Sequence, residues 1–233
     1  MKGLVIEVAG ILYGVSVGPG DPELLTIKAA NIIGKCGIIA VPQTKGENAL
    51  ALSIAEQAVD ISSKKIVYLD FLMTKDEEKL KVNHRESAEK LAVYLEKGED
   101  VALLNIGDIS VYSTFSYIMD IILTMGYQSV MCPGVTSFCA AASAARIPLV
   151  SGAETLTVTP GQNPRLSGIL EEGGTKVIMK SGRSFSEVKQ TILAGRPEAE
   201  VTIVENCGLK NEKICRGLDG DEEHGYFTLF IVK

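Results

Sequence analysis

The chain has 233 residues, of which 46% are hydrophobic and 22% charged, the ordinary composition of a soluble globular protein with one large domain or two small ones. It carries 23 lysines and arginines against 29 aspartates and glutamates, and this net charge of −6 argues against nucleic-acid binding, which needs a basic surface. No apolar run approaches the roughly 20 residues that span a bilayer, and the first residues lack a secretory-signal pattern, so no membrane association or export is expected.

The cysteine and histidine content bears on compartment and metal binding. Five cysteines, an odd number, include no C-x-x-C pair, and most lie in apolar surroundings. Free thiols of this kind are typical of the reducing cytoplasm, where we place the protein. With only two histidines, far apart in the sequence, no metal site is expected.

The first predicted elements are a strand, a tight turn and a helix. Leu12–Val17 is apolar and rich in β-branched residues, as a buried strand is. Gly18, Pro19 and Gly20 form the turn, and Asp21 is a natural N-cap before a helix that starts with proline. A turn at the carboxyl end of a strand is where open α/β sheets bind ligands.

A dinucleotide site is a weak interpretation of this turn. The third glycine of G-x-G-x-x-G is replaced by Glu23, and no acidic residue follows the next strand, at Ile38–Val41. Asp21 would also place a negative charge where a pyrophosphate binds. A Walker loop is excluded because the chain has no G-x-x-x-x-G-K-[ST] string.

Helices and strands alternate through the rest of the first half and favour a mainly parallel sheet. The C-terminal part has strands with few long helices, which favours a mixed sheet. We therefore predict an α/β fold with an N-terminal domain over residues 1–114 and a C-terminal domain over 115–233. The predicted elements, in order, are the helix Glu47–Val59, the strand Lys65–Leu69, the helix Asp76–Lys97, the strand Val101–Asn105, the helix Thr114–Thr124, the strand Ser129–Cys132, the helix Phe138–Arg146, the strands Thr155–Thr159 and Lys176–Met179, the helix Ser186–Ala194, and the strands Val201–Glu205 and Tyr226–Val232.

Several separated strings carry a resemblance to a known family. GVSVGPGDPELLTIKAA, NIGDISVYST and CPGVTSFCAAAS occur in that order. From Tyr13 to Lys233 the chain resembles the tetrapyrrole (corrin/porphyrin) methyltransferases, which move a methyl group from S-adenosylmethionine to a reduced tetrapyrrole. FLMTKDEEKL, ETLTVTPG and ENCGLKNEKICRGLD are similar to strings of the C-20 methyltransferases of cobalamin synthesis. The resemblance implies two α/β domains with the active site in a cleft between them, and a homodimer.

The resemblance also implies which residues contact the cofactor. The implied contacts are Pro19, Ile106, Gly107, Asp108, Val111, Tyr112, Ser113, Thr114, Thr136, Ser137, Met179, Cys207 and Gly208. Ile106 and Cys207 depart from the family pattern, which often has glycine at both positions. As candidate substrate contacts we single out His84, Arg85, Glu154 and Lys180, and we assign no general base.

Each role has a plain structural alternative. Asp108 can be a turn residue instead of an anion near the cofactor's positive charge. Thr136 and Ser137 can be helix caps, and Met179 a core residue. His84 falls on the apolar stripe of its helix, so a partly buried histidine is the first interpretation and a proton acceptor or substrate contact the second.

Three hypotheses of function follow. The first is methylation of C-20 of precorrin-2 or of cobalt-factor II. Transfer from a sulfonium is an in-line displacement whose leaving thioether needs no proton, so positioning supplies most of the rate. The second is another family reaction, on a different precorrin carbon, on uroporphyrinogen III, on ribosomal RNA or on a diphthamide precursor. The third is a module that binds S-adenosylmethionine without transferring its methyl group.

Overall fold

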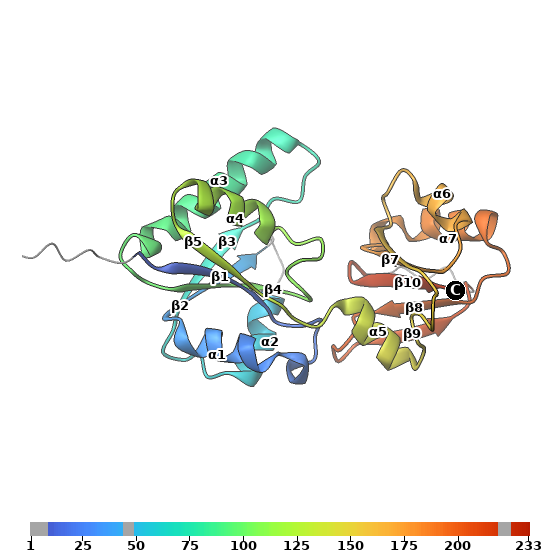
Figure 1. Ribbon diagram of the computed structural model, residues 1–233, viewed down its shortest axis with the longest axis horizontal. Coiled ribbons are helices and arrows are strands. Elements are labelled where there is room, and N and C mark those ends of the chain that lie inside the picture. The colour runs from blue at the N-terminus through green and yellow to red at the C-terminus, as the bar shows by residue number, and fades with distance from the viewer. Residues whose placement is uncertain (1–8, 44–48, 219–224) are drawn as a thin grey trace, which may run out of the picture. The chain divides into compact units, whose positions relative to one another are not determined.

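The computed structural model describes residues 9–43, 49–218 and 225–233. The chain forms two compact units, Met1–Thr136 and Ser137–Lys233, which are coloured blue to green and yellow to red in Figure 1. The predicted boundary at residues 114/115 differs from this division. The elements that follow it, α4 (Phe115–Thr124) and β5 (Gln128–Cys132), belong to the first unit, because β5 pairs with the first strand of the chain.

The first unit is built on a five-stranded parallel sheet in the order β3-β2-β4-β1-β5. The predicted parallel α/β architecture is confirmed. The remaining elements of this unit are β1 (Ile11–Ser16), the 3-10 turn η1 (Pro22–Leu24), α1 (Ile27–Lys35), β2 (Ile38–Gln43), α2 (Leu50–Ala58), β3 (Lys65–Asp70), α3 (Glu77–Leu95) and β4 (Val101–Asn105). The expected start of α2, Glu47, lies outside the described residues.

Both faces of this sheet are covered, since successive residues of a strand point to opposite sides. Leu12 and Leu103 pack with α3 and α4 on one face, whereas Val15 and Leu104 pack with α1 and α2 on the other. Figure 1 shows the two helix pairs on opposite sides of the sheet. Burial on both faces explains why these strands read as continuous apolar runs.

The helix predicted to start at Pro22 begins later. Asp21 caps only the short turn η1, where its Oδ1 accepts a hydrogen bond from Glu23 N–H at 2.9 Å. Leu25 and Thr26 are then extended, and α1 begins at Ile27 with Thr26 as its N-cap. Leu25 packs into the core beside α1 and α2. Asp21 and Thr26 are thus N-caps of two successive elements, and Leu25, which packs against the core, lies between them.

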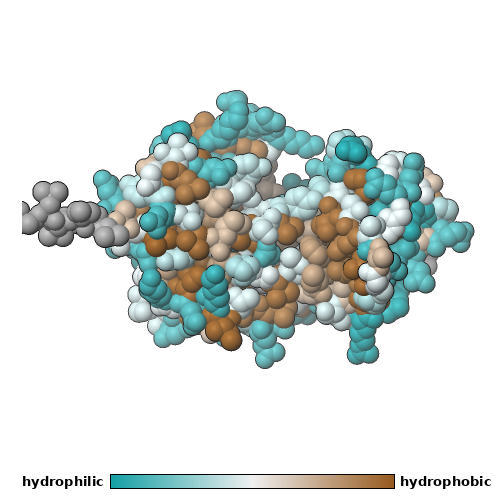
Figure 2. Space-filling view, viewed as in Figure 1, coloured by the Kyte–Doolittle hydropathy of each residue, from teal (hydrophilic) through white to brown (hydrophobic). Residues whose placement is uncertain are grey.

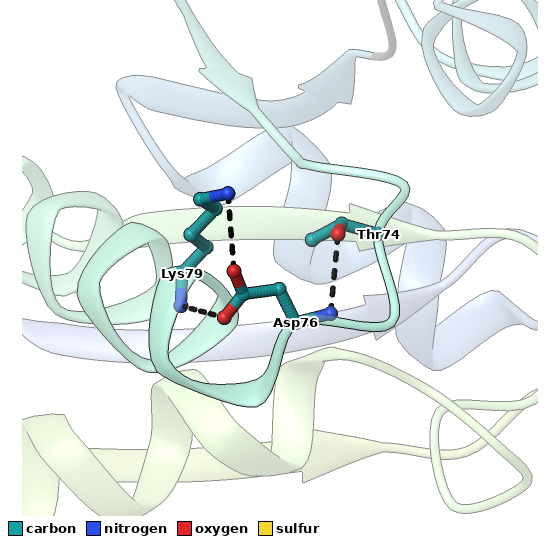
Figure 3. A network of polar contacts seen from close by, with 3 residues as sticks. All are labelled: Thr74, Asp76 and Lys79. Atoms are coloured by element: carbon teal, nitrogen blue, oxygen red, sulfur yellow. Dashed lines mark hydrogen bonds and ion pairs between the residues drawn. The ribbon is translucent and has the colours of Figure 1, made fainter.

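Helix α3 begins at a well-defined cap (Figure 3). Asp76 Oδ1 accepts a hydrogen bond from Lys79 N–H at 3.2 Å, and its Oδ2 lies 3.0 Å from Lys79 Nζ. The Asp76 N–H donates to Thr74 Oγ1 at 3.1 Å. Hydrogen bonds to Lys79 lower the pKa of Asp76. The carboxylate therefore remains charged at the positive end of the helix dipole.

Replacing this cap should weaken the first unit. We expect Asp76→Ala to lower the melting temperature by about 2–4 °C, because an N–H of the first turn loses its acceptor. Glu86→Ala, at an exposed position within the same helix, is the matched control. Differential scanning calorimetry provides the measurement, and equal melting temperatures for the two variants would contradict the capping role.

The second unit has a mixed sheet in the order β6-β7-β10-β8-β9, as predicted for this half. β6 and β7 are parallel, whereas β10 is antiparallel to both β7 and β8. The elements are α5 (Ser137–Ala145), β6 (Leu156–Pro160), α6 (Leu166–Glu171), β7 (Thr175–Met179), the 3-10 turn η2 (Gly182–Ser184), α7 (Phe185–Gly195), β8 (Val201–Glu205), β9 (Lys213–Arg216) and β10 (Thr228–Val232). The short elements α6 and β9 were not predicted from the sequence.

The described surface is mixed in character. Figure 2 shows hydrophobic side chains among hydrophilic ones. The five cysteines form no disulfide: Cys36, Cys132 and Cys207 are buried, and Cys139 and Cys215 are exposed. No helix among the described residues is long and apolar enough to cross a bilayer. Within the same ranges, no three His, Cys, Asp or Glu side chains are grouped so that they could hold a metal ion.

Candidate functional site

Three loops meet at the carboxyl edge of the first sheet. They follow β1, β4 and β5, and because β1 lies between the other two strands the loops are direct neighbours. Gly107 N–H donates to the Gly18 carbonyl at 2.7 Å, which joins the first two loops. Both glycines have positive φ, 77° at Gly18 and 73° at Gly107, a conformation that a side chain would strain. The predicted turn thus lies beside the loop that carries Asp108.

Ser16, the last residue of β1, joins all three strand ends. Its Oγ donates to the Cys132 carbonyl at 2.7 Å and accepts from the Ile109 N–H at 2.9 Å. The side chain is fully buried, and both partners are backbone groups of the neighbouring loops or strands. One hydroxyl therefore fixes the spacing of three chain segments that are far apart in the sequence.

We expect Ser16→Ala to destabilise the first unit by about 2 kcal/mol, because it leaves a buried N–H and a buried carbonyl without a partner. Ser129→Ala is the matched control, since Ser129 Oγ makes a single hydrogen bond to the Leu12 carbonyl nearer the opposite end of the β1–β5 pair. Urea unfolding followed by circular dichroism measures both. If Ser16→Ala lowers the free energy of unfolding no more than Ser129→Ala does, the two hydrogen bonds of Ser16 add no stability beyond that of one ordinary hydrogen bond.

Asp108 joins the β4 loop to the β5 loop. Its Oδ2 accepts from Gly134 N–H at 2.7 Å, and its Oδ1 accepts from Ser110 N–H at 2.9 Å and from the Ser110 hydroxyl. Burial opposes ionisation of this carboxyl, but the hydrogen bonds outweigh it and lower the pKa of Asp108. Three protein donors therefore hold the Asp108 carboxylate, which the sequence suggested as an anion near the cofactor's positive charge.

The loop after β4 is also fastened to the helix that it precedes. Ser113 Oγ donates to Asn105 Oδ1 at 2.7 Å and accepts from Phe115 N–H at 3.1 Å. Tyr112 has a φ of 50°, which a residue with a side chain rarely adopts. The two Ser113 hydrogen bonds tie the loop to the end of β4 and to the start of α4.

The structure brings most of the predicted first-unit contacts together. Pro19 is buried in the loop after β1, and Thr136 is the last residue of the loop between β5 and α5. The remaining residues lie in the single loop between β4 and α4: Ile106, Gly107, Asp108, Val111, Tyr112, Ser113 and Thr114.

In the second unit, four predicted contacts lie at one sheet edge. Met179 ends β7 and is followed by Lys180, while Cys207 and Gly208 follow β8, which runs parallel to β7. Burial and the nearby Glu212 carboxylate raise the pKa of Cys207 to about 12, so its thiol stays neutral. Cys207 also packs in the apolar core of this unit, as buried structural cysteines do.

Two predicted second-unit residues lie elsewhere. Glu154 precedes β6, at the edge opposite Met179, because β6 and β7 run parallel and pair Pro160 with Met179. Its Oε2 accepts from Ser151 N–H at 2.8 Å. Ser137 is the first residue of α5.

His84 and Arg85 lie in the N-terminal half of α3. The imidazole of His84 is partly buried, and this burial lowers its pKa, so the ring is neutral at pH 7. It stacks on Tyr117 with ring centroids 4.9 Å apart and an interplanar angle of 9°. Arg85 is exposed, with Nη1 3.7 Å from Glu89 Oε1.

Sequence reasoning missed Ser16, Gly134 and Tyr117. A hydroxyl at the end of an apolar strand was the available signal for Ser16. A Cβ at Gly134 would lie 2.4 Å from Ser16 Cβ and 3.0 Å from the Gly107 carbonyl oxygen. That close approach depends on strand order, so no local pattern reveals it.

A parallel sheet with tight, glycine-containing loops gathered at its carboxyl edge is the architecture of an α/β ligand-binding protein. The chain belongs to the tetrapyrrole (corrin/porphyrin) methylases, whose family model matches residues 11–220.

Relatives and solved structures agree with this membership. A probable cobalt-precorrin-2 C(20)-methyltransferase of Methanocaldococcus jannaschii is 35% identical over 95% of each chain. A cobalt-precorrin-2 C(20)-methyltransferase of Salmonella typhimurium is 30% identical over 96% of each chain. The fold matches a cobalt precorrin-4 methyltransferase with a TM-score of 0.76 at 18% identity, covering 99% of this chain and 98% of the other. It also matches uroporphyrin-III C-methyltransferase of Thermus thermophilus complexed with S-adenosyl homocysteine, with a TM-score of 0.72 at 22% identity, covering 96% and 92%.

Proposed function

We propose that this protein transfers a methyl group from S-adenosylmethionine to C-20 of precorrin-2 or of cobalt-factor II in cobalamin biosynthesis. The observation that carries the proposal is the joint of three loops at the carboxyl edge of the first sheet, in a chain 35% identical to a probable cobalt-precorrin-2 C(20)-methyltransferase. We further propose that it works as a homodimer in the cytoplasm, binds no nucleic acid and associates with no membrane.

The residues present fit the cofactor. The polar groups of the cofactor need hydrogen-bond partners close to the backbone. The loop after β4 offers the Thr114 hydroxyl, and Gly18 and Gly107, which lack a side chain, allow close approach. We propose that Pro19 and the loop 106–114 contact the cofactor, together with Thr136 and Ser137. Met179, Cys207 and Gly208 are the proposed second-unit contacts, and Cys207 would pack as a neutral thiol.

When bound, the cofactor supplies an electrophilic methyl group on a sulfonium. The chain's own task is to hold the nucleophilic carbon in line with that methyl group and to exclude water. No proton needs to move in the displacement itself, which agrees with a site whose buried carboxylate, Asp108, is occupied by backbone and hydroxyl donors. His84, Arg85 and Lys180 remain proposed substrate contacts, as does Glu154, which lies at the opposite edge of the second sheet from Lys180.

The direct test incubates the purified protein with S-adenosylmethionine and precorrin-2 or cobalt-factor II in anaerobic buffer. Mass spectrometry should detect the gain of one methyl group, and NMR should locate it at C-20. The substrate that is converted also decides whether cobalt enters before this step. Methylation at another carbon would overturn the C-20 assignment, and cofactor binding without methylation of any tetrapyrrole would favour a binding module.

A further inference from the structure

A partly exposed aromatic cluster lies on the α3/α4 face of the first unit, outside the proposed cofactor contacts. Phe71, His84 and Tyr117 form it, and we call these three residues the aromatic ledge. The His84 and Tyr117 rings are parallel at 4.9 Å, and Phe71 meets His84 edge-on, with centroids 6.4 Å apart and an interplanar angle of 79°. Tyr117 is 59% exposed, so much of its surface is left open to a ligand.

The ledge is held in place by its surroundings. Asn83, on α3, donates from Nδ2 to the Asp70 carbonyl at 2.8 Å and accepts at Oδ1 from Leu72 N–H at 3.2 Å. These two bonds bracket Phe71 and fasten its backbone to the helix that carries His84. An aromatic surface fixed in this way loses little conformational entropy when a flat ligand stacks on it.

The ledge is continuous with the proposed cofactor loop. Phe71 directly follows β3, and Tyr117 lies in the first turn of α4, so both are at the carboxyl edge of the parallel sheet. Tyr117 N–H donates to the Thr114 carbonyl at 3.2 Å, so the Tyr117 backbone lies within one helical turn of the loop's last residue. Ser113 in turn fixes that loop to Asn105.

We propose that the aromatic ledge stacks against a pyrrole-derived ring of the tetrapyrrole substrate and so positions the macrocycle beside the cofactor loop. The assignment rests on the proposed function. It makes Tyr117 and His84 positioning residues and gives the neutral imidazole a stacking role in place of proton transfer. Aromatic rings pack in offset-stacked pairs, so the exposed Tyr117 ring can take a flat π-system, and exposed Leu72 and Met73 adjoin Phe71 along the chain as further apolar surface.

The test measures tetrapyrrole binding separately from turnover. Equilibrium dialysis with cobalt-factor II, detected by its own absorbance, gives a dissociation constant, and turnover assays give kcat and KM. We expect Tyr117→Ala to raise the dissociation constant and KM about tenfold, because one stacked ring contributes about 1.4 kcal/mol, while kcat changes little. Tyr117→Phe should restore binding, because it keeps the ring. His84→Ala should weaken binding in the same direction.

The matched control is Tyr68→Ala. Tyr68 is an exposed tyrosine of β3, and its neighbours Val67 and Leu69 are the strand residues that pack on the α3/α4 face, so Tyr68 points to the other side. S-adenosyl homocysteine affinity, measured by calorimetry, should be unchanged in all variants. If Tyr117→Ala and His84→Ala both bind cobalt-factor II as tightly as wild type, the proposed stacking on the aromatic ledge is overturned.

Other outcomes separate the ledge from the proposed function. If the wild-type protein binds cobalt-factor II through Tyr117 without methylating it, the proposed function is overturned and the stacking role of the ledge stands. If the wild-type protein methylates C-20 and Tyr117→Ala binds the tetrapyrrole as tightly as wild type, the proposed function stands and the role of the ledge is overturned. If Tyr117→Ala changes the sedimentation velocity and leaves tetrapyrrole binding intact, the aromatic ledge is a contact between copies of the chain. This outcome also overturns the proposal.

Discussion

Asp108→Asn should destabilise the first unit by about 3 kcal/mol and weaken cofactor binding. The carboxylate accepts hydrogen bonds at both oxygens, from Gly134 and Ser110, in a buried position. An amide has only one acceptor oxygen, so its NH₂ group must face a donor, and a buried N–H of the site loses its partner. Urea unfolding at neutral pH and calorimetric titration with S-adenosyl homocysteine give the two quantities.

The pH dependence of this effect has a definite sign. Because the folded protein holds the pKa of Asp108 below its unfolded value of about 3.9, the ionised carboxylate adds stability above that value. The contribution is lost as the pH falls through the folded pKa. We therefore expect the difference in stability between wild type and Asp108→Asn to be full at neutral pH and to shrink on acidification below about pH 4.

A matched control and a local readout make this prediction sharp. Asp120→Asn changes an exposed carboxylate on α4 and should leave stability unchanged. Hydrogen exchange should show the Gly134 amide opening faster in Asp108→Asn than in Asp120→Asn. Equal stability of the two variants, or an unaltered Gly134 exchange rate, would mean that the carboxylate does not hold the loops together.

Gly134→Ala should destabilise the first unit by about 2 kcal/mol and reduce affinity for S-adenosyl homocysteine. The added Cβ would lie 2.4 Å from Ser16 Cβ and 3.0 Å from the Gly107 carbonyl oxygen. Relief of this overlap requires the β5 loop to move away from the other two, at the usual cost of overpacking. Movement of that loop also lengthens the bond from Gly134 N–H to Asp108, so stability and binding fall together.

Gly37→Ala is the control for the glycine prediction. A Cβ at Gly37 meets nothing within 4 Å, and the residue lies before β2, at the opposite end of the strand from the loops. Differential scanning calorimetry and calorimetric titration compare the two variants. If Gly134→Ala and Gly37→Ala bind S-adenosyl homocysteine equally well, the close approach of the three loops is not needed for cofactor binding.

The sequence predicted the features that depend on residues close together in the chain, and it did not predict those that depend on distant residues. The turn at Gly18, the strand Val101–Asn105 and the long helix over Asp76–Lys97 were predicted from neighbouring residues, and the structure has each of them, the helix as Glu77–Leu95. Local signals failed where two competed. Asp21 and Thr26 both have side chains that cap helices, and the structure starts α1 after Thr26, with Leu25 packed against the core between the two caps.

The sites depended on pairing that no local pattern contains. The bond between Ser16 and Cys132 spans 116 residues, and the bond between Asp108 and Gly134 spans 26. Both exist because β1 lies between β4 and β5. Glu154 is a second example. From the sequence, Glu154 and Lys180 were both candidate substrate contacts, but the parallel pairing of β6 and β7 places Glu154 at the edge of the second sheet opposite Lys180.

The sequence by itself determined the alternation of strands and helices, the glycine turns and, through the strings at Gly18, Gly107 and Gly134, the family. These features depend on backbone conformation and on periodic burial, which act over a few residues. Only the tertiary structure decided that three loops share one joint, that Asp108 is occupied by Gly134 and Ser110, and that Phe71, His84 and Tyr117 meet. The physical reason is that strand order and side-chain contact arise from burial shared between distant segments, and a local pattern carries no record of which segment will be the neighbour.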